Sequence, residues 1–116
     1  MNEINGKFEE YAKLIKAIGD ANRIKILNSL SKKEKSVMQI MQDLKISQPL
    51  ISHHLKILKY EGLVTDRKEG VYVYYGLISP AINSLVNCII VCCDQVINFK
   101  EGKIKRIEAN CGVCEK

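Results

Sequence analysis

Apolar positions recur at helical spacing along most of the chain, and the breaks between these stretches predict five helices. The first is expected over residues 8–18 and the second over 20–31, with Asp20 as its N-cap. A charged loop follows at 32–35. Ser36 then caps a third helix, and Ser47 a fourth that runs to about Tyr60. The short turn Lys45–Ile46 between the third and fourth helices predicts a helix-turn-helix.

The pattern after residue 62 changes from helical spacing to short strand-like runs. Residues 63–68 and 71–77 are expected to pair as a β-hairpin, with Glu69–Gly70 as its two-residue turn. A fifth helix, over about 81–99, follows Pro80. The fold class is therefore mostly α with a β-hairpin wing, a winged helix-turn-helix. Residues 1–100 form its DNA-binding and dimerisation domain, and residues 101–116 form a cysteine-containing tail.

The fifth helix is apolar almost all round, which predicts burial in a dimer that also uses the first helix. The chain has 116 residues, which is enough for one domain. No apolar run approaches the roughly 20 residues that span a bilayer. The polar N-terminus does not resemble a targeting signal. We therefore expect a cytoplasmic protein with no membrane partner, whose five cysteines are mostly reduced.

The positive charge is concentrated in one block of the sequence. Residues 23–59 carry eight basic and two acidic side chains, although the net charge of the whole chain is only +5. Such a block indicates a polyanion, most often nucleic acid, or else a solvated lysine-rich surface.

The fourth helix is the candidate DNA-reading element. Ile51, Leu55 and Leu58 form a core stripe. Another face carries Ser52, Lys56 and Lys59, with His53 beside them and Gln48 in the first turn. Amide and hydroxyl groups suit base edges, and cations suit phosphates. The alternative is an ordinary amphipathic surface helix.

The hairpin adds basic and aromatic side chains to the candidate DNA-binding surface. Arg67 and Lys68 are expected at its tip, and Tyr72 and Tyr74 on one strand face. A wing of this kind contacts phosphates or the minor groove, although packing of a tyrosine on the hairpin itself is the alternative. We expect a double-stranded DNA partner with an inverted repeat, read by a homodimer.

Three segments together resemble the ArsR/SmtB family of dimeric winged-helix repressors, over about residues 8–100. They are DANRIKIL at 20–27, ISQPLISHHLKIL at 46–58, and EGLV with DRKEG at 61–70. Members of this family release DNA when a metal, metalloid or oxidant binds. The resemblance implies DNA contacts by Gln48, Ser52, His53 and His54, and by Arg67 in the wing.

The cysteines are the candidate sensor ligands, because both histidines lie in the fourth helix. Thiol-only sites select thiophilic ions. The third-helix cysteines of many arsenic sensors in the family are absent at 36–41, but the adjacent pair Cys92–Cys93 resembles that of other arsenic sensors. As(III) is thus the first candidate, bound by Cys92, Cys93, Cys111 and Cys114. Cys88 is interpreted as a small buried hydrophobe, with a ligand role left open.

Three alternatives to a thiolate-sensing repressor remain. The first is a redox- or sulfur-sensing repressor of the same fold, and the second a winged-helix module that binds only protein. The third is a thiol oxidoreductase that uses Cys111 and Cys114. It is disfavoured because a lowered thiol pKa needs a following helix N-terminus, and only two residues remain. No catalytic triad, phosphate loop or carboxylate pair is present, so we expect no enzyme.

Overall fold

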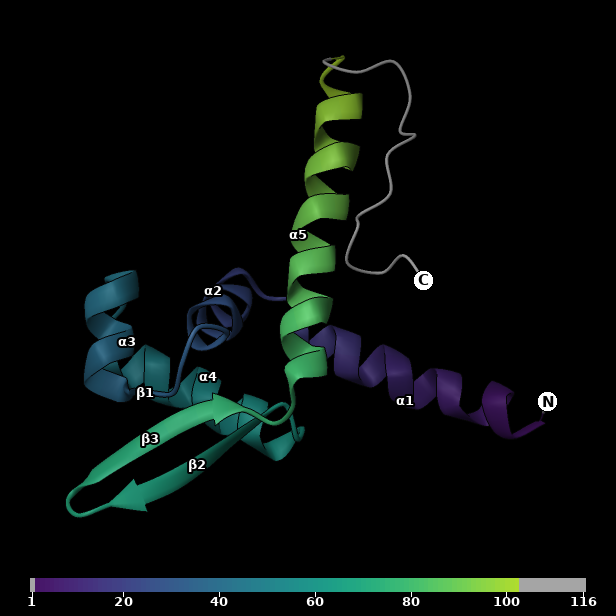
Figure 1. Cartoon of the computed structure of the whole chain (residues 1–116). Helices are drawn as coiled ribbons and strands as arrows, with labels where there is room; N and C mark the ends of the chain where they lie inside the picture. Colours follow the sequence, from purple (N-terminus) through teal and green to yellow (C-terminus); the bar gives the residue numbers. More distant parts are fainter. Residues whose placement is uncertain (1, 103–116) are drawn as a thin grey trace. The chain divides into compact units, whose positions relative to one another are not determined.

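The computed structural model describes the backbone of residues 2–102 and the side chains of residues 6–102. It divides into two units, which are described separately, with the boundary between Ile78 and Ser79. The first unit holds four helices and a small sheet (Figure 1), and the second contains one further helix. The described elements are α1 (Asn2–Ile18), α2 (Ala21–Leu30), β1 (Lys35–Ser36), α3 (Val37–Leu44), α4 (Gln48–Tyr60), β2 (Val64–Glu69), β3 (Tyr72–Leu77) and α5 (Pro80–Lys100).

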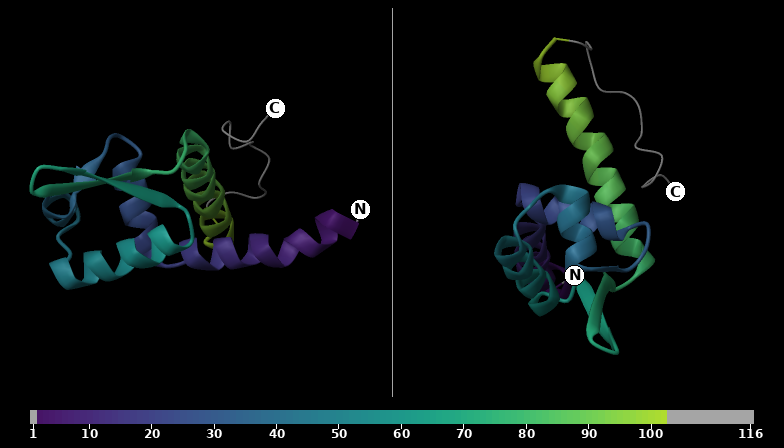
Figure 2. Two further views of the ribbon diagram at one scale, coloured as in Figure 1. Left: turned by 90° about the horizontal axis from the view of Figure 1, so that it is seen from below. Right: turned by 90° about the vertical axis from the view of Figure 1, so that its left-hand side faces the viewer.

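Local capping signals position the helices α2 and α3 of the first unit. The Asp20 carboxylate accepts hydrogen bonds from the backbone N–H groups of Asn22 and Arg23 at the start of α2. Ser36 and Gln39 form a reciprocal capping box at the start of α3. The predicted caps at Asp20 and Ser36 are thus confirmed. α1 begins at Asn2, six residues before the predicted start, and its N-terminal part extends beyond the other helices of the unit (Figure 2).

The three helices α2, α3 and α4 pack around one apolar core. Six of its aliphatic side chains are at most 1% exposed, namely Ile26, Leu27, Ile40, Ile51, Leu55 and Leu58. Ile51, Leu55 and Leu58 recur at helical spacing along α4 and so bury one face of that helix. The helix α2 adds Ile26 and Leu27 to the core, and α3 adds Ile40. The turn between α3 and α4 passes through Lys45, which takes a left-handed conformation with φ 58°. This turn fixes the direction in which α4 leaves α3.

The sheet has three antiparallel strands in the order β1-β3-β2, and not only the predicted hairpin. Lys35 pairs with Tyr75 and Ser36 with Tyr74, so part of the expected charged loop is a short strand. The hairpin turn is Gly70–Val71, one residue later than predicted, because Glu69 pairs with Tyr72. Gly70 has φ +63°, which suits the first central position of a tight hairpin turn. The hairpin turn borders α3, because Val71 lines a hollow together with Met38 and Met41 of that helix.

The second unit contains α5, for which Ser79 accepts the N-terminal capping bond from the backbone N–H of Ala81. The helix has 21 residues and contains an 18-residue stretch with a mean hydropathy of 1.5, so by length and composition alone it is able to cross a membrane. The expectation that no apolar run reaches this length was wrong. Polar residues such as Asn83 and Asp94 interrupt the apolar sequence, but the mean hydropathy of the helix remains high enough for a membrane span. A helix that packs against protein passes the same test, so this finding is weak evidence for a membrane.

Candidate nucleic-acid interface and cysteine cluster

The helix α4 separates its side chains into a buried stripe and an exposed row. Pro49 lies in the first turn, where its missing N–H breaks no helical bond. Ser47 precedes the helix as predicted, but its side chain makes no capping bond. Ile51, Leu55 and Leu58 face the core. The row opposite them remains exposed and consists of four residues predicted to contact DNA: Gln48, Ser52, His53 and Lys56.

His54 differs from the other residues assigned to DNA contact, because its side chain is buried and only 6% exposed. Its Nε2 lies 3.9 Å from Oδ1 of Asp20, the residue that caps α2. Its Nδ1 is buried without a hydrogen-bond partner among the described residues, and the same holds for Nε of Arg23. The expected direct DNA contact of His54 is therefore corrected. His54 follows Ile51 by three residues on the core stripe, so it positions α4 against the start of α2.

The environment of His54 favours its neutral form. Burial lowers the pKa of the imidazole, and the positive charges of Arg23 and His53 lower it further, although Asp20 opposes them. For Asp20, burial acts to raise the pKa, but backbone hydrogen bonds from Arg23 and Asn22 and the charge of His54 bring it below its usual value. The pair thus favours a neutral imidazole beside a charged carboxylate.

The pH dependence of stability follows from the lowered pKa of His54. The unfolded chain, in which the imidazole has its ordinary pKa of 6.5, binds the proton more readily than the folded chain. The stability that His54 contributes is therefore present above pH 6.5 and is lost as the pH falls from 6.5 through the lowered folded value. We expect the urea concentration at the midpoint of unfolding to decrease when the pH is lowered from 7.5 to 5.5. The substitution His54→Gln should make this decrease smaller. The matched variant His53→Gln, at an exposed position, should retain the decline. An equal slope for His54→Gln and the unmodified chain would contradict the assignment.

Arg67 of the wing forms ion pairs with two glutamates. Nε of Arg67 donates to Glu34 at 2.8 Å and Nη1 donates to Glu69 at 2.9 Å, so the pKa of Arg67 is raised. The guanidinium also lies 5.1 Å from the ring centroid of Tyr74, its partner across the strands. Arg67 lies within β2, not at the tip as expected. A phosphate contact by Arg67 therefore requires exchange of these surface ion pairs, which are individually weak.

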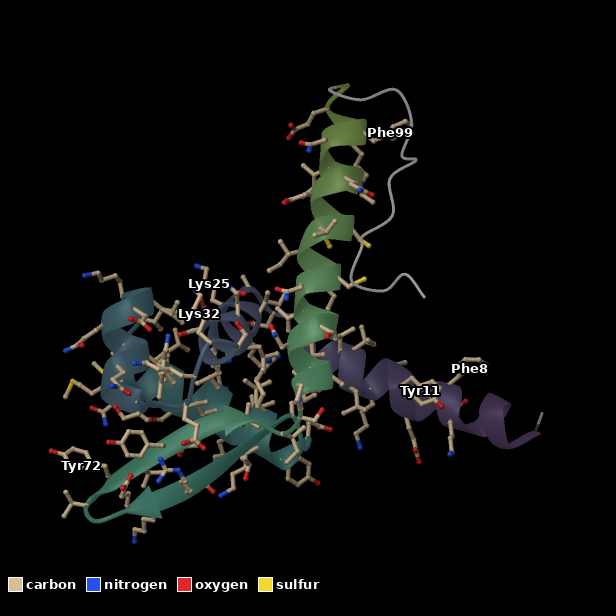
Figure 3. All side chains as sticks on the ribbon, viewed as in Figure 1. Phe8, Tyr11, Lys25, Lys32, Tyr72 and Phe99 are labelled. Atoms are coloured by element: carbon tan, nitrogen blue, oxygen red, sulfur yellow. The ribbon has the colours of Figure 1, made fainter. Side chains whose placement is uncertain are left out.

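The other wing residues assigned to DNA binding lie on the surface. Lys68 is exposed, and Tyr72 is 61% exposed next to the turn, where Figure 3 labels it. The rings of Tyr72 and Tyr74 are 6.4 Å apart, which confirms that they share one strand face. On α4, Lys59 donates to Asp66 of β2 at 2.8 Å. Lys59 therefore connects the recognition helix to the wing, a role that its sequence position did not reveal.

Two of the four assigned cysteine ligands lie in the described part of the chain. Cys92 and Cys93 are exposed on α5, and with Val96 and Ile97 they line an apolar hollow of about 260 Å³. Cys111 and Cys114 lie outside the described residues. Among the described residues, no group of three or more His, Cys, Asp or Glu side chains is close enough together to hold a metal ion. An ion bound at Cys92 and Cys93 therefore requires further ligands.

Cys88 is the third cysteine of α5. It is half-buried and disulfide-bonded. Its sulfur also lies 3.8 Å from that of Cys92, which is a contact and not a bond, because bonded sulfurs are about 2.0 Å apart. The interpretation of Cys88 as a purely hydrophobic side chain therefore does not fit the structure. The i, i+4 spacing of Cys88 and Cys92 was the sequence signal for this sulfur contact.

Known proteins resemble the chain in both sequence and fold. The model of the bacterial regulatory protein arsR family matches residues 20–66. An uncharacterized HTH-type transcriptional regulator of Methanocaldococcus jannaschii is 38% identical over 84 residues, which cover 72% of this chain and 94% of that protein. The chain belongs to the ArsR family. It is thus a DNA-binding transcriptional regulator, not an enzyme.

Two further comparisons agree with this ArsR-family assignment. The arsenical resistance operon repressor of Staphylococcus aureus is 32% identical, over 68% of this chain and 76% of that protein. The solution structure of a homodimeric winged helix-turn-helix DNA-binding domain from Mycobacterium bovis has a TM-score of 0.73 and 26% identity. That match covers 84% of this chain and 91% of the other. The predicted winged helix-turn-helix fold of this ArsR-family chain is confirmed.

Proposed function

We propose that this chain is a homodimeric, cytoplasmic repressor that reads an inverted-repeat operator and releases it when a thiophilic ion binds its cysteines. The exposed row of α4 carries the DNA-binding part of this proposal. Gln48 and Ser52 supply hydrogen-bonding groups for base edges, and Lys56 supplies a cation for a phosphate. His53 belongs to the same row. In this proposal the wing residues Arg67, Lys68 and Tyr72 contact the DNA backbone.

Base readout and phosphate contact are separable by mutation. We expect Gln48→Ala or Ser52→Ala to cost roughly 1–3 kcal/mol on the operator and to relax base preference. Lys56→Ala should weaken binding to all duplexes alike and reduce the salt slope by about one. The operator is first selected from random duplexes, and fluorescence anisotropy then measures affinity on operator and scrambled DNA. Equal losses on both duplexes for Gln48→Ala would contradict the assignment of α4 as the reading helix.

Exposed apolar side chains on two helices support the dimer. Phe8 and Ile15 on α1 are 56% and 53% exposed, and Ile97 and Phe99 on α5 are 50% and 45% exposed. Figure 3 labels Phe8 on α1 and Phe99 on α5. A second copy is the occupant that fits these faces, because solvent exposure of such patches is unfavourable and a relative of this fold is homodimeric. This packing also explains why α5 is apolar enough to span a membrane.

The dimer prediction is tested at exposed positions, where substitution leaves the protomer's own core intact. We expect Ile97→Glu and Ile15→Glu each to give monomers, because two carboxylates would be buried in a symmetric interface. Sedimentation velocity measures the oligomeric state, and Val71→Glu in the hairpin turn, 88% exposed, is the matched control. A monodisperse monomer for the unmodified chain would exclude this part of the proposal.

The adjacent thiols of Cys92 and Cys93 support the sensor part of the proposal. They lie on a helix assigned to the dimer, and thiolates select ions such as As(III) and Cd(II). A similar protein is an arsenical resistance operon repressor, so As(III) remains the first candidate. In this proposal Cys111 and Cys114 complete the ligand set in the reduced protein. The contact of Cys88 with Cys92 favours a second candidate, a thiol-based redox repressor of the same fold.

A further inference from the structure

A basic hollow in the first unit has no role in the proposed repressor mechanism. It has a volume of about 380 Å³ and lies between α2, β1 and the end of α3. Most of its lining is polar: Lys25, Asn28, Ser29, Lys32, Lys35 and Asp43. Figure 3 labels Lys25 on α2 and Lys32 in the turn that follows this helix, on the side of the unit away from the strand that carries Tyr72.

Lys35 is the centre of a hydrogen-bonded cluster on one side of the hollow. This side chain is only 11% exposed, and its Nζ donates to Ser29 Oγ at 2.9 Å and to Asp43 Oδ2 at 2.5 Å. Ser29 also donates to Asp43 at 3.3 Å. The hydrogen bond from Lys35 is the main cause that lowers the pKa of Asp43, and the charge of Lys33 adds to it. The Asp43 carboxylate is therefore ionised at neutral pH and already committed to Lys35.

The charges around the hollow do not balance. Three ammonium groups, from Lys25, Lys32 and Lys35, line it, whereas Asp43 is the single acidic residue among its described lining residues. Because Lys35 already pairs with Asp43, the charges of Lys25 and Lys32 remain uncompensated within the hollow. Ammonium groups bind phosphate oxygens well, and the side-chain amide of Asn28 adds donors. A volume near 380 Å³ is within the usual range of small-ligand pockets.

The operator backbone is a less suitable source of this phosphate. Met38 and Met41 of α3 line a different hollow together with Gln48 and Tyr72, two of the assigned DNA contacts. Asp43 follows Met41 by two residues. It therefore lies on another face of α3, because each residue turns the helix by about 100°. The basic hollow therefore opens on a different side of α3 from the assigned DNA surface.

We infer that this hollow is a binding site for a small phosphorylated molecule with at least two negative charges. Lys25 and Lys32 hold its phosphate oxygens, and the Lys35–Asp43–Ser29 cluster forms the fixed wall behind them. The inference does not depend on the proposed metal response, because binding is measurable on the reduced protein alone.

Inorganic pyrophosphate is the probe for this site. Isothermal titration calorimetry on the full chain should show saturable binding that weakens about tenfold or more in Lys25→Gln/Lys32→Gln. The matched control Lys7→Gln/Lys13→Gln, which removes the same charge from exposed positions of α1, should bind as the unmodified chain does. Amide resonances of Ser29 and Leu44 should shift on titration. Absence of saturable binding, an equal loss in the control, or shifts confined to α4 and the wing would each overturn the inference.

A second measurement separates a free ligand from DNA phosphate. The salt slope of duplex binding should be the same for Lys25→Gln/Lys32→Gln and the unmodified chain. If these lysines contacted two DNA phosphates instead, the slope would fall by nearly two. A slope that falls in this way, without pyrophosphate binding, would assign the hollow to DNA and overturn the inference.

Discussion

The substitution Leu55→Ala should lower the free energy of unfolding by about 2–5 kcal/mol, one of the largest effects that a single change in α4 can have. Leu55 is 1% exposed and lies in the core between α2, α3 and α4. Its truncation removes apolar contacts and leaves a cavity that the surrounding helices fill only partly. Urea unfolding followed by circular dichroism measures this loss.

The neighbouring residue provides a matched control for Leu55→Ala. Lys56 is exposed on the same helix, and Lys56→Ala should change stability by no more than about 0.5 kcal/mol while weakening DNA binding. Two adjacent positions of α4 thus affect different properties, since Leu55 determines stability and Lys56 determines DNA affinity. If Lys56→Ala destabilised the chain as much as Leu55→Ala, the division of α4 into core and DNA faces would be wrong.

Much of the first unit is predictable because its signals are local. The caps at Asp20 and Ser36 require side chains within three residues of the bonds they make, and both form as expected. The spacing of Ile51, Leu55 and Leu58 likewise fixes the buried face of α4. Where the determinants of an element are contained in one helical turn, the sequence pattern was sufficient, except that Ser47 precedes α4 without making a capping bond.

The strand β1 was not predictable because its cause is distant in sequence. Lys35 and Ser36 lie in a lysine-rich segment without alternation, and they become a strand only by pairing with Tyr75 and Tyr74 of β3. Lys35 of this strand also pairs with Asp43 in the basic hollow, and the sequence pattern did not predict that contact. By contrast, the burial of His54 was available from the pattern. Its spacing from Ile51 and Leu58 places it on the core stripe, so the DNA contact that the family resemblance implied does not fit this position.

The candidate sensor site was only half predictable. Adjacent cysteines in a helix are visible in sequence, and Cys92 and Cys93 are indeed on the surface of α5. Which further ligands reach them depends on chain segments far away in sequence, for which periodicity carries no information. The identity of the ion therefore has to come from titration.

As(III) should lower the operator affinity of the reduced protein by roughly 5- to 150-fold at fixed salt, which corresponds to a coupling free energy of about 1–3 kcal/mol. The reason is geometric. Cys92 and Cys93 lie on α5, which the proposal places in the dimer interface, so an ion that they bind together with Cys111 and Cys114 changes how two protomers fit together. The two recognition helices then no longer match successive turns of the major groove. The ion acts only through its different affinities for the two dimer states.

The decisive comparison uses anisotropy titrations of the operator with and without As(III), on the reduced unmodified chain, on Cys92→Ser/Cys93→Ser and on Cys88→Ser. The double variant should bind DNA normally and lose the response, because it lacks two of the four thiolates, whereas Cys88→Ser should keep it. If As(III) releases the double variant as readily as the unmodified chain, the adjacent pair is structural. If thiophilic ions release neither the unmodified chain nor the double variant from DNA, but an oxidant releases the unmodified chain, the redox mechanism replaces metal sensing. In that case Cys88→Ser should abolish the response, because it removes the thiol that contacts Cys92.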